Sequence, residues 1–112
     1  MSDISVLARI FKALSVDVRI QIIDLLRGRP LCVNALASSL NISSAAVSQH
    51  LRILRDLDIV KPERRGYFVH YRLNLEKLEE WGRITQIFLG GDGSASHREE
   101  QDVPQKQPGN AR

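Results

Sequence analysis

Apolar residues recur at three- and four-residue spacing through roughly the first half of the chain, which is the pattern of successive amphipathic helices. One helix is expected over residues 3–13. A second begins near Asp17 and runs until Gly28, and Pro30 confirms the break. A short third helix is expected over residues 33–40. The chain therefore begins as a mainly helical domain.

A fourth helix follows a turn in which Asn41 suits the left-handed conformation and Ser43 can cap the helix. The expected buried stripe consists of Val47, Leu51, Leu54 and Leu57. The opposite side carries short polar groups followed by arginines: Ser44, Ser48, Gln49, Arg52 and Arg55. Within this helix no acidic residue occurs before Asp56, whereas surface helices usually mix Glu with Lys. The third and fourth helices together predict a helix-turn-helix, and the second helix of this motif is suited to reading DNA.

Beyond Asp58 the apolar spacing changes from helical to alternating, which predicts a β-hairpin, or wing. The apolar strand residues are Ile59, Val60, Val69, Tyr71 and Leu73, and the tip consists of Arg64, Arg65 and Gly66. Asn74 can cap a last helix that runs to about Leu89. The expected fold is mainly α with a small β-hairpin, a winged helix-turn-helix of the order ααααββα.

The last helix has an apolar face that is too broad for a small monomer to cover, and the first helix is similarly apolar. We expect the first and last helices to form a symmetric homodimer interface. Its predicted residues are Leu7, Ile10, Phe11, Leu78, Trp81, Ile84 and Phe88. The alternative is that both helices pack only within their own chain.

Composition divides the chain into a domain over residues 1–89 and a tail over residues 90–112. The tail has almost no apolar residues and is rich in Gly, Ser, Gln and Pro, so it is expected to be disordered. The domain carries 13 Lys or Arg against 9 Asp or Glu, and the tail carries 3 against 4. The basic part is therefore the folded part, which favours a polyanionic partner such as double-stranded DNA.

Other features narrow the class of protein. The one cysteine, Cys32, excludes an internal disulfide framework and any multi-cysteine metal cluster within one chain, so structural zinc is not expected. No apolar run has the length of a membrane span, and the N-terminus lacks the basic segment followed by an apolar segment that a secretory signal has. A cytoplasmic protein is therefore expected. An enzyme is not expected, because the sequence offers no carboxylate pair, nucleophilic triad or glycine-rich phosphate loop in a suitable context.

Several motifs occur together in a specific order. They are Phe11 to Ser15 followed by Arg19, then Leu31 to Val33, then Ala45 to Arg55, and finally Gly66 with Val69, Tyr71, Arg72 and Leu73. In these motifs the chain resembles the ArsR/SmtB family of winged-helix repressors, over residues 4–89. The resemblance implies a homodimer that binds an imperfect palindrome through paired recognition helices and wings. It also implies release from DNA when an inducer binds, often a metal ion or metalloid.

The chain departs from this family's best-known inducer sites. Arsenic sensors carry Cys-Val-Cys where this chain has Cys32, Val33 and Asn34, and one thiolate cannot chelate a metalloid tightly. Zinc and nickel sensors use Asp and His on the last helix, yet residues 75–89 contain no His or Cys. We therefore expect no metal and no cofactor, and the inducer stays unidentified. Cys32 has two interpretations, a small packing residue or a thiol that senses oxidants or electrophiles.

The recognition helix and the wing are expected to contact different parts of the DNA. Ser44, Ser48 and Gln49 would contact bases, and Arg52 and Arg55 would contact bases or phosphates. Three basic wing residues would approach the minor groove or the backbone: Lys61, Arg64 and Arg65.

Two histidines, His50 and His70, are expected to lie in different surroundings. His50 is interpreted as a structural, hydrogen-bonded histidine, whereas His70 is expected to point outward from the wing, with or without a phosphate contact. The competing interpretation of the chain is a winged-helix module for protein interaction, without specific DNA binding.

Overall fold

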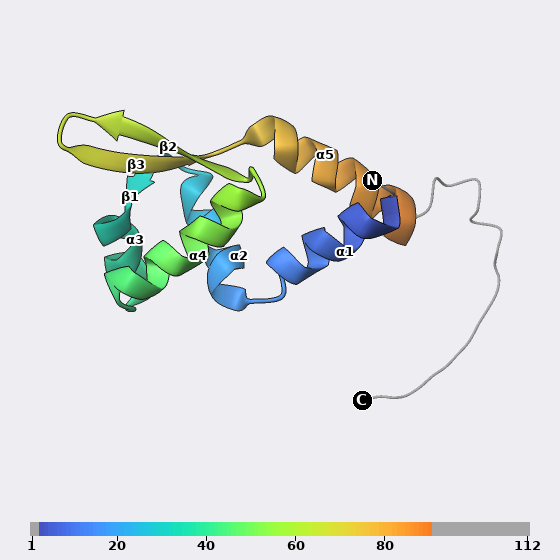
Figure 1. The fold of residues 1–112 in the computed structure, drawn as a ribbon, viewed down its shortest axis with the longest axis horizontal. Helices are drawn as coiled ribbons and strands as arrows, with labels where there is room; N and C mark the ends of the chain where they lie inside the picture. Colours follow the sequence, from blue (N-terminus) through green and yellow to red (C-terminus); the bar gives the residue numbers. More distant parts are fainter. Residues whose placement is uncertain (1–2, 91–112) are drawn as a thin grey trace. The chain divides into compact units, whose positions relative to one another are not determined.

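The computed structural model describes residues 3–90 and has the predicted order of helices and hairpin, with one added strand (Figure 1). The elements are α1 (Asp3–Ala13), α2 (Asp17–Leu26), β1 (Leu31–Cys32), α3 (Val33–Leu40), α4 (Ser44–Asp56), β2 (Val60–Arg65), β3 (Phe68–Leu73), α5 (Leu75–Thr85) and a π-helical turn (Gln86–Gly90). The predicted tail falls outside the described residues from 91 onward. The winged helix-turn-helix prediction is confirmed.

The sheet has three antiparallel strands in the order β1-β3-β2, so the wing is joined to the start of α3 by the added strand. In β1, Leu31 pairs with Tyr71 and Cys32 pairs with His70. A two-residue strand is too short to give an alternating pattern, which is why the sequence did not predict it. Away from β1, the β2–β3 hairpin extends past α3 and α4 (Figure 1).

The helix-turn-helix is held by a core in which the predicted stripe of α4 is central. Val47, Leu51 and Leu54 are at most 1% exposed, whereas Leu57 is half-buried and forms the C-cap of α4. Other helices, β2 and the residue before β2 supply the remaining large, fully buried side chains: Ile10, Ile22, Leu36, Ile59 and Val60. Burying such aliphatic groups stabilises the fold by roughly 1.5–3 kcal/mol for each side chain.

The helix ends follow the predicted capping chemistry at three of four positions. Asn41 is left-handed, with φ 57° and ψ 45°. The Oγ of Ser43 accepts a hydrogen bond from the Ala46 amide, and the Oδ1 of Asn74 accepts one from the Lys77 amide. Gly28 differs, because α2 ends at a C-cap, Arg27, with right-handed backbone and Gly28 has no positive φ.

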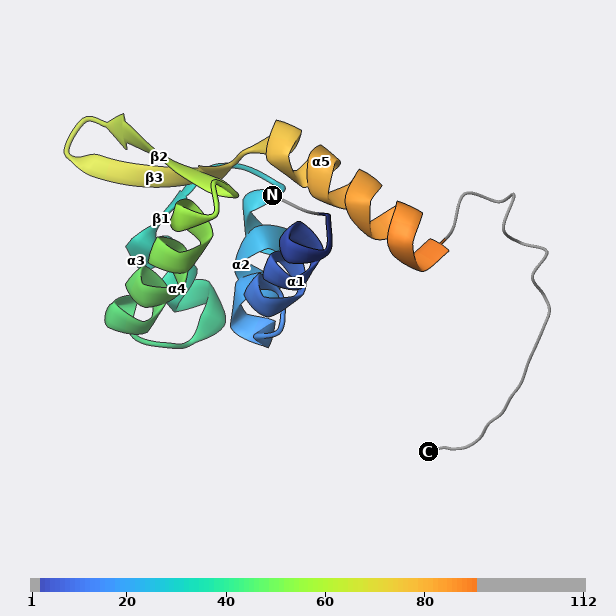
Figure 2. The ribbon, with the colours of Figure 1, turned by 45° about the vertical axis from the view of Figure 1, so that its right-hand side comes forward.

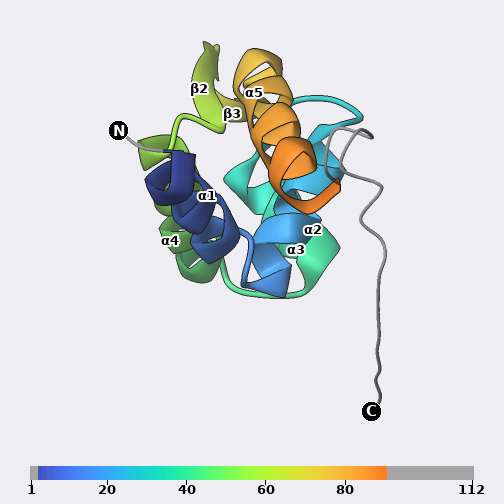
Figure 3. The ribbon, with the colours of Figure 1, turned by 90° about the vertical axis from the view of Figure 1, so that its right-hand side faces the viewer.

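Residues up to Trp81 form one unit, and the helix continues from Gly82 as part of a second unit. Within the first unit, α1 lies alongside α2 and the C-terminal part of α4 (Figures 2 and 3). Arg9 and Ala13 of α1 line a cleft together with Ile53 of α4, which agrees with this arrangement. No helix in the described range is both long and apolar enough to cross a membrane.

Candidate nucleic-acid interface

The recognition helix, α4, is fixed at its start by two hydroxyl groups. Ser43 caps the helix through its 3.0 Å bond from the Ala46 amide. The Oγ of Ser44 donates a 3.0 Å hydrogen bond to the Oδ1 of Asn34 at the start of α3. This bond links the two helices of the helix-turn-helix at their exposed edge, and the Ser44 oxygen can still accept a hydrogen bond from a ligand.

The outward face of α4 presents the predicted polar and basic side chains to solvent. Ser48, Gln49, Arg52 and Arg55 are all exposed. Ser48 and the two arginines line a recess together with Asp56 and with Tyr71 of β3. Neither arginine forms an ion pair within the described part of the chain. The recognition helix and the wing therefore share one surface on which two guanidinium groups are free to meet an anion.

The wing carries further positive charge, and part of it is held by an acidic residue. Lys61, Arg64 and Arg65 are exposed. The carboxylate of Glu63 lies 3.3 Å from the Nη2 of Arg65 and 3.4 Å from the Nε of Arg72. The register places Arg64 on the opposite face of the hairpin from these ion pairs. Only some of the positive charge of the wing is therefore balanced within the chain.

His50 has the structural role that its position in the sequence suggested. Its Nδ1 accepts a hydrogen bond from the Nε of Arg19, at 3.3 Å. The same guanidinium donates to the carbonyl oxygens of Lys12 and Ala13, at 3.4 Å and 3.3 Å. Arg19 thus ties the end of α1 and the recognition helix to α2. The residue patterns gave no such role to Arg19, because the bond to His50 joins residues 31 positions apart.

Cys32 and His70 face each other across the sheet. Cys32 is half-buried and is the N-cap of α3, but its side chain makes no capping hydrogen bond. The Nδ1 of His70 is buried without a hydrogen-bond partner, so the prediction of an outward-pointing His70 is wrong in part. The reason is that β1 adds a strand beside β3. The described residues contain no group of three or more side chains that could hold a metal ion.

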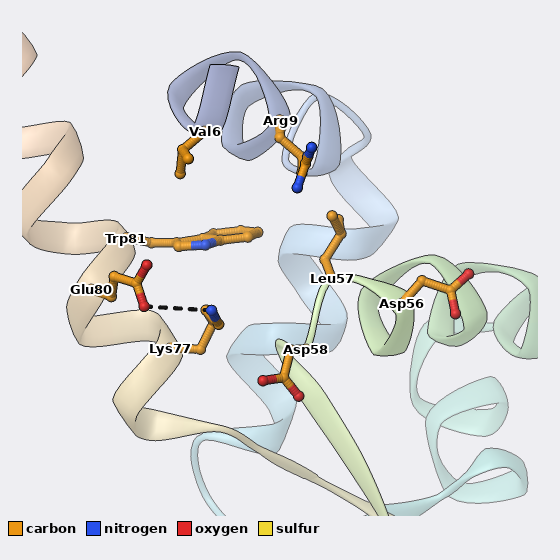
Figure 4. A pocket seen from close by; sticks show the side chains of 8 residues that line it. All are labelled: Val6, Arg9, Asp56, Leu57, Asp58, Lys77, Glu80 and Trp81. Atoms are coloured by element: carbon orange, nitrogen blue, oxygen red, sulfur yellow. Dashed lines mark hydrogen bonds and ion pairs between the residues drawn. The ribbon is translucent and has the colours of Figure 1, made fainter. Parts of the chain in front are cut away.

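A pocket of about 360 Å³ lies where the end of α4 meets α1 and α5 (Figure 4). Its lining residues are Val6, Arg9, Asp56, Leu57, Asp58, Lys77, Glu80 and Trp81. The Nζ of Lys77 lies 3.4 Å from the Oε1 of Glu80, and the indole of Trp81 forms a flat wall (Figure 4). The pocket touches the joint between the recognition helix and the wing, and sequence patterns had not predicted it.

The residues predicted for a dimer interface differ in how far their own chain covers them. Leu7, Ile10 and Trp81 are at most 7% exposed. Leu78 and Ile84 are half-buried, and Phe11 and Phe88 are 42% and 64% exposed. The chain itself thus covers one part of the predicted set, and Phe11 and Phe88 leave large apolar surfaces open.

Comparison with known proteins gives consistent matches. Residues 17–61 match the family model described as "Bacterial regulatory protein, arsR family". The chain is 37% identical over 71 residues to the transcriptional repressor SdpR of Bacillus subtilis (strain 168), which covers 63% of this chain and 79% of SdpR.

Solved structures show the same fold. An ArsR-like transcriptional regulator from Rhodococcus sp. RHA1 superposes with a TM-score of 0.68 and 28% identity, covering 79% of this chain and 82% of that one. The homodimeric winged helix-turn-helix DNA-binding domain of Mb0332 from Mycobacterium bovis has a TM-score of 0.61 and 25% identity, covering 85% and 86%.

Proposed function

The chain belongs to the ArsR family of bacterial regulatory proteins, and from this premise we propose that it is a homodimeric repressor of transcription. It would bind an imperfect palindrome in its target promoter and leave it when an inducer binds. Proteins of this family are DNA-binding transcription regulators and not enzymes. The observation that carries the proposal is the recess between α4 and β3, because it joins polar side chains and free guanidinium groups on one surface.

The recognition helix would enter the major groove with its exposed N-terminal half. The amide of Gln49 can donate to and accept from an adenine edge, and the Ser48 hydroxyl can do the same with most bases. Ser44 would act as an acceptor while it stays bound to Asn34. Arg52 and Arg55 follow one and two turns later, within reach of bases or phosphates.

The wing would hold the adjacent stretch of duplex. Arg64, Arg65 and Lys61 are exposed and can approach the minor groove or its phosphates. Such contacts add affinity for any sequence, since phosphates are the same everywhere. Base contacts in the major groove would therefore come from the helix, and the basic residues of the wing would add general affinity.

A homodimer would place two recognition helices about 34 Å apart, one helical turn of DNA, on one face of the duplex. Support comes from the exposed apolar side chains of Phe11 and Phe88, which a second copy could cover. The Mb0332 domain is homodimeric and SdpR is a repressor, which also supports the proposal.

The inducer would act by preferring a dimer in which the two recognition helices have a different spacing, so that its binding weakens DNA binding. A soft-metal chelate does not fit the chain at Cys32, because Val33 and Asn34 follow instead of a second thiol. Oxidation of Cys32 stays the competing interpretation to simple packing of its side chain.

The test begins by selecting duplexes from a random library with the purified full chain. Fluorescence anisotropy then compares the selected duplex with random DNA at several salt concentrations. Gln49→Ala is expected to relax the preference at one base position by about 1–3 kcal/mol. Arg64→Ala is expected to weaken the binding of all sequences alike and to lower the salt slope by about one for each wing.

Two outcomes would contradict the proposal. Equal losses on selected and random DNA for Gln49→Ala would remove its base-reading role. Weak and equal binding of both DNAs by the unmodified protein would favour the protein-interaction module instead.

A further inference from the structure

The tip of the wing carries two aromatic side chains that the rest of the described structure does not cover. Tyr67 is 99% exposed and Phe68 is 60% exposed. Most large aromatic side chains gain stability by burial, so two adjacent ones in solvent mark a surface that binds a partner. No sequence pattern had assigned either residue a role.

The hairpin geometry makes these rings the leading edge of the wing. Arg65 pairs with Phe68, so that Gly66 and Tyr67 form a two-residue turn. Gly66 has a φ of 65° and is the only one of the two with positive φ, which is the pattern of a type II′ turn. A tight turn of this kind leaves Tyr67 at the extreme end of the hairpin, away from the helices.

Positive charge flanks the rings on both faces of the hairpin. Arg65 lies on the same face as Phe68, and Arg64 lies on the other face with Val69. An aromatic edge between two guanidinium groups is complementary to a groove whose stacked bases a ring can wedge apart and whose two rims carry phosphates. That is the chemistry of the DNA minor groove.

The tip is also continuous with the proposed DNA-reading surface. Tyr71 lies in the same strand, β3, and lines the recess with Ser48, Arg52 and Arg55. β3 therefore runs from the recess beside the recognition helix to the aromatic tip. A duplex bound along α4 would meet the tip in its neighbouring minor groove.

We propose that Tyr67 and Phe68 form an aromatic wedge, which enters the minor groove beside each half-site and opens a flexible pyrimidine–purine step. Arg64 and Arg65 bind the phosphates on either side, and the Tyr67 hydroxyl donates to an adenine N3 or thymine O2 acceptor. The wedge bends the duplex, so the protein discriminates among sequences that its side chains do not read directly. This inference depends on the proposed DNA-binding function.

The experiment uses the full chain with a duplex selected from a random library. Two fluorophores at the duplex ends report bending by energy transfer, and 2-aminopurine at the flanking pyrimidine–purine step reports unstacking. The double variant Tyr67→Ala with Phe68→Ala is expected to abolish both signals and to weaken binding of this duplex about tenfold. Its binding of random DNA and its salt slope should stay unchanged, because no charge has been removed.

Arg64→Ala is the matched control on the same hairpin. It should reduce the salt slope while the remaining complex still bends the DNA. Tyr67→Phe should keep the bend and lose the preference for an A·T pair at the step. Folding of the variants is checked by circular dichroism, and both aromatic positions are exposed enough for the fold to tolerate alanine.

The outcomes separate this inference from the proposed function. If the unmodified protein binds the selected duplex tightly but the double variant bends and binds it equally well, the wedge is wrong and the repressor proposal stands. The wedge is equally wrong if the rings prove to bind a protein or a membrane instead. If the unmodified protein does not distinguish the selected duplex from random DNA, both proposals fail.

Discussion

Glu63→Gln is expected to tighten the binding of DNA of any sequence. In the free protein the Glu63 carboxylate holds Arg65 at 3.3 Å and Arg72 at 3.4 Å. The Arg65 side chain is 49% exposed, that of Arg72 is 48% exposed, and that of Glu63 is 40% exposed. A phosphate that binds either guanidinium must therefore compete with Glu63, which also repels the DNA.

The geometry sets the size of the effect. Exposed single-contact pairs of this kind contribute about 0.5 kcal/mol each, so releasing both should raise DNA affinity by about 1 kcal/mol, or roughly fivefold. If one more guanidinium reaches a phosphate in each wing, the plot of log K against log salt steepens by about 0.9 for each wing. The protein itself should lose less than about 1 kcal/mol of unfolding free energy.

Anisotropy titrations of selected and random duplexes at several salt concentrations measure both quantities. Asp24→Asn is the matched control, because it removes one exposed carboxylate from α2 and changes the net charge equally. If only the overall charge matters, the two variants will behave alike. Weaker DNA binding by Glu63→Gln would refute the reasoning, since it would mean that Glu63 positions Arg65 and Arg72 productively.

Three further changes test the core, the cap and the interface. Leu54→Ala should lower the unfolding free energy by about 2–5 kcal/mol in urea titrations followed by Trp81 fluorescence, because Leu54 is 0% exposed; the same change at Ile53, 37% exposed, should cost far less. Ser43→Ala should cost about 1 kcal/mol. Ser43→Asp should restore that stability but weaken DNA binding relative to the unmodified protein, because the added charge repels phosphate; unchanged DNA affinity would argue against DNA lying close to this helix end. Phe88→Glu should yield a folded monomer in sedimentation and weaken DNA binding more than tenfold, and an unchanged sedimentation coefficient would exclude Phe88 from the interface.

Local chemistry made much of the fold predictable. The stripe of α4 was identified from spacing alone, and Val47, Leu51 and Leu54 are its buried residues. The caps at Ser43 and Asn74 were equally predictable from the sequence, because a short polar side chain just before an amphipathic helix accepts hydrogen bonds from the free amides at the helix start. In each case the information lay within a few residues of the feature that it determined.

Long-range contacts explain what the sequence could not predict. The strand β1 exists only because β3 offers it a hydrogen-bonding edge, and this pairing buries the Nδ1 of His70. The bond from Arg19 to His50 likewise depends on how α2 packs against α4. Periodicity identified the apolar faces of the first and last helices, but it could not say what covers Trp81.

Asn74 connects the recognition helix, the wing and the last helix, so a change at one of them could be transmitted to the others. Asp58 joins α4 to β2 with a φ of 66°, a left-handed conformation that Asp adopts more readily than most other residues. The Nδ2 of Asn74 donates to the carbonyl oxygen of Asp58 at 2.9 Å and to its Oδ2 at 3.2 Å, while the Oδ1 of Asn74 caps α5. One buried amide therefore fixes both the joint and the first turn of α5. Because the pocket beside Trp81 is lined by Asp58 as well as by Lys77 of α5, a molecule bound there would bear on this same joint. As long as these hydrogen bonds hold, a shift of the first turn of α5 would be transmitted to the joint between the recognition helix and the wing.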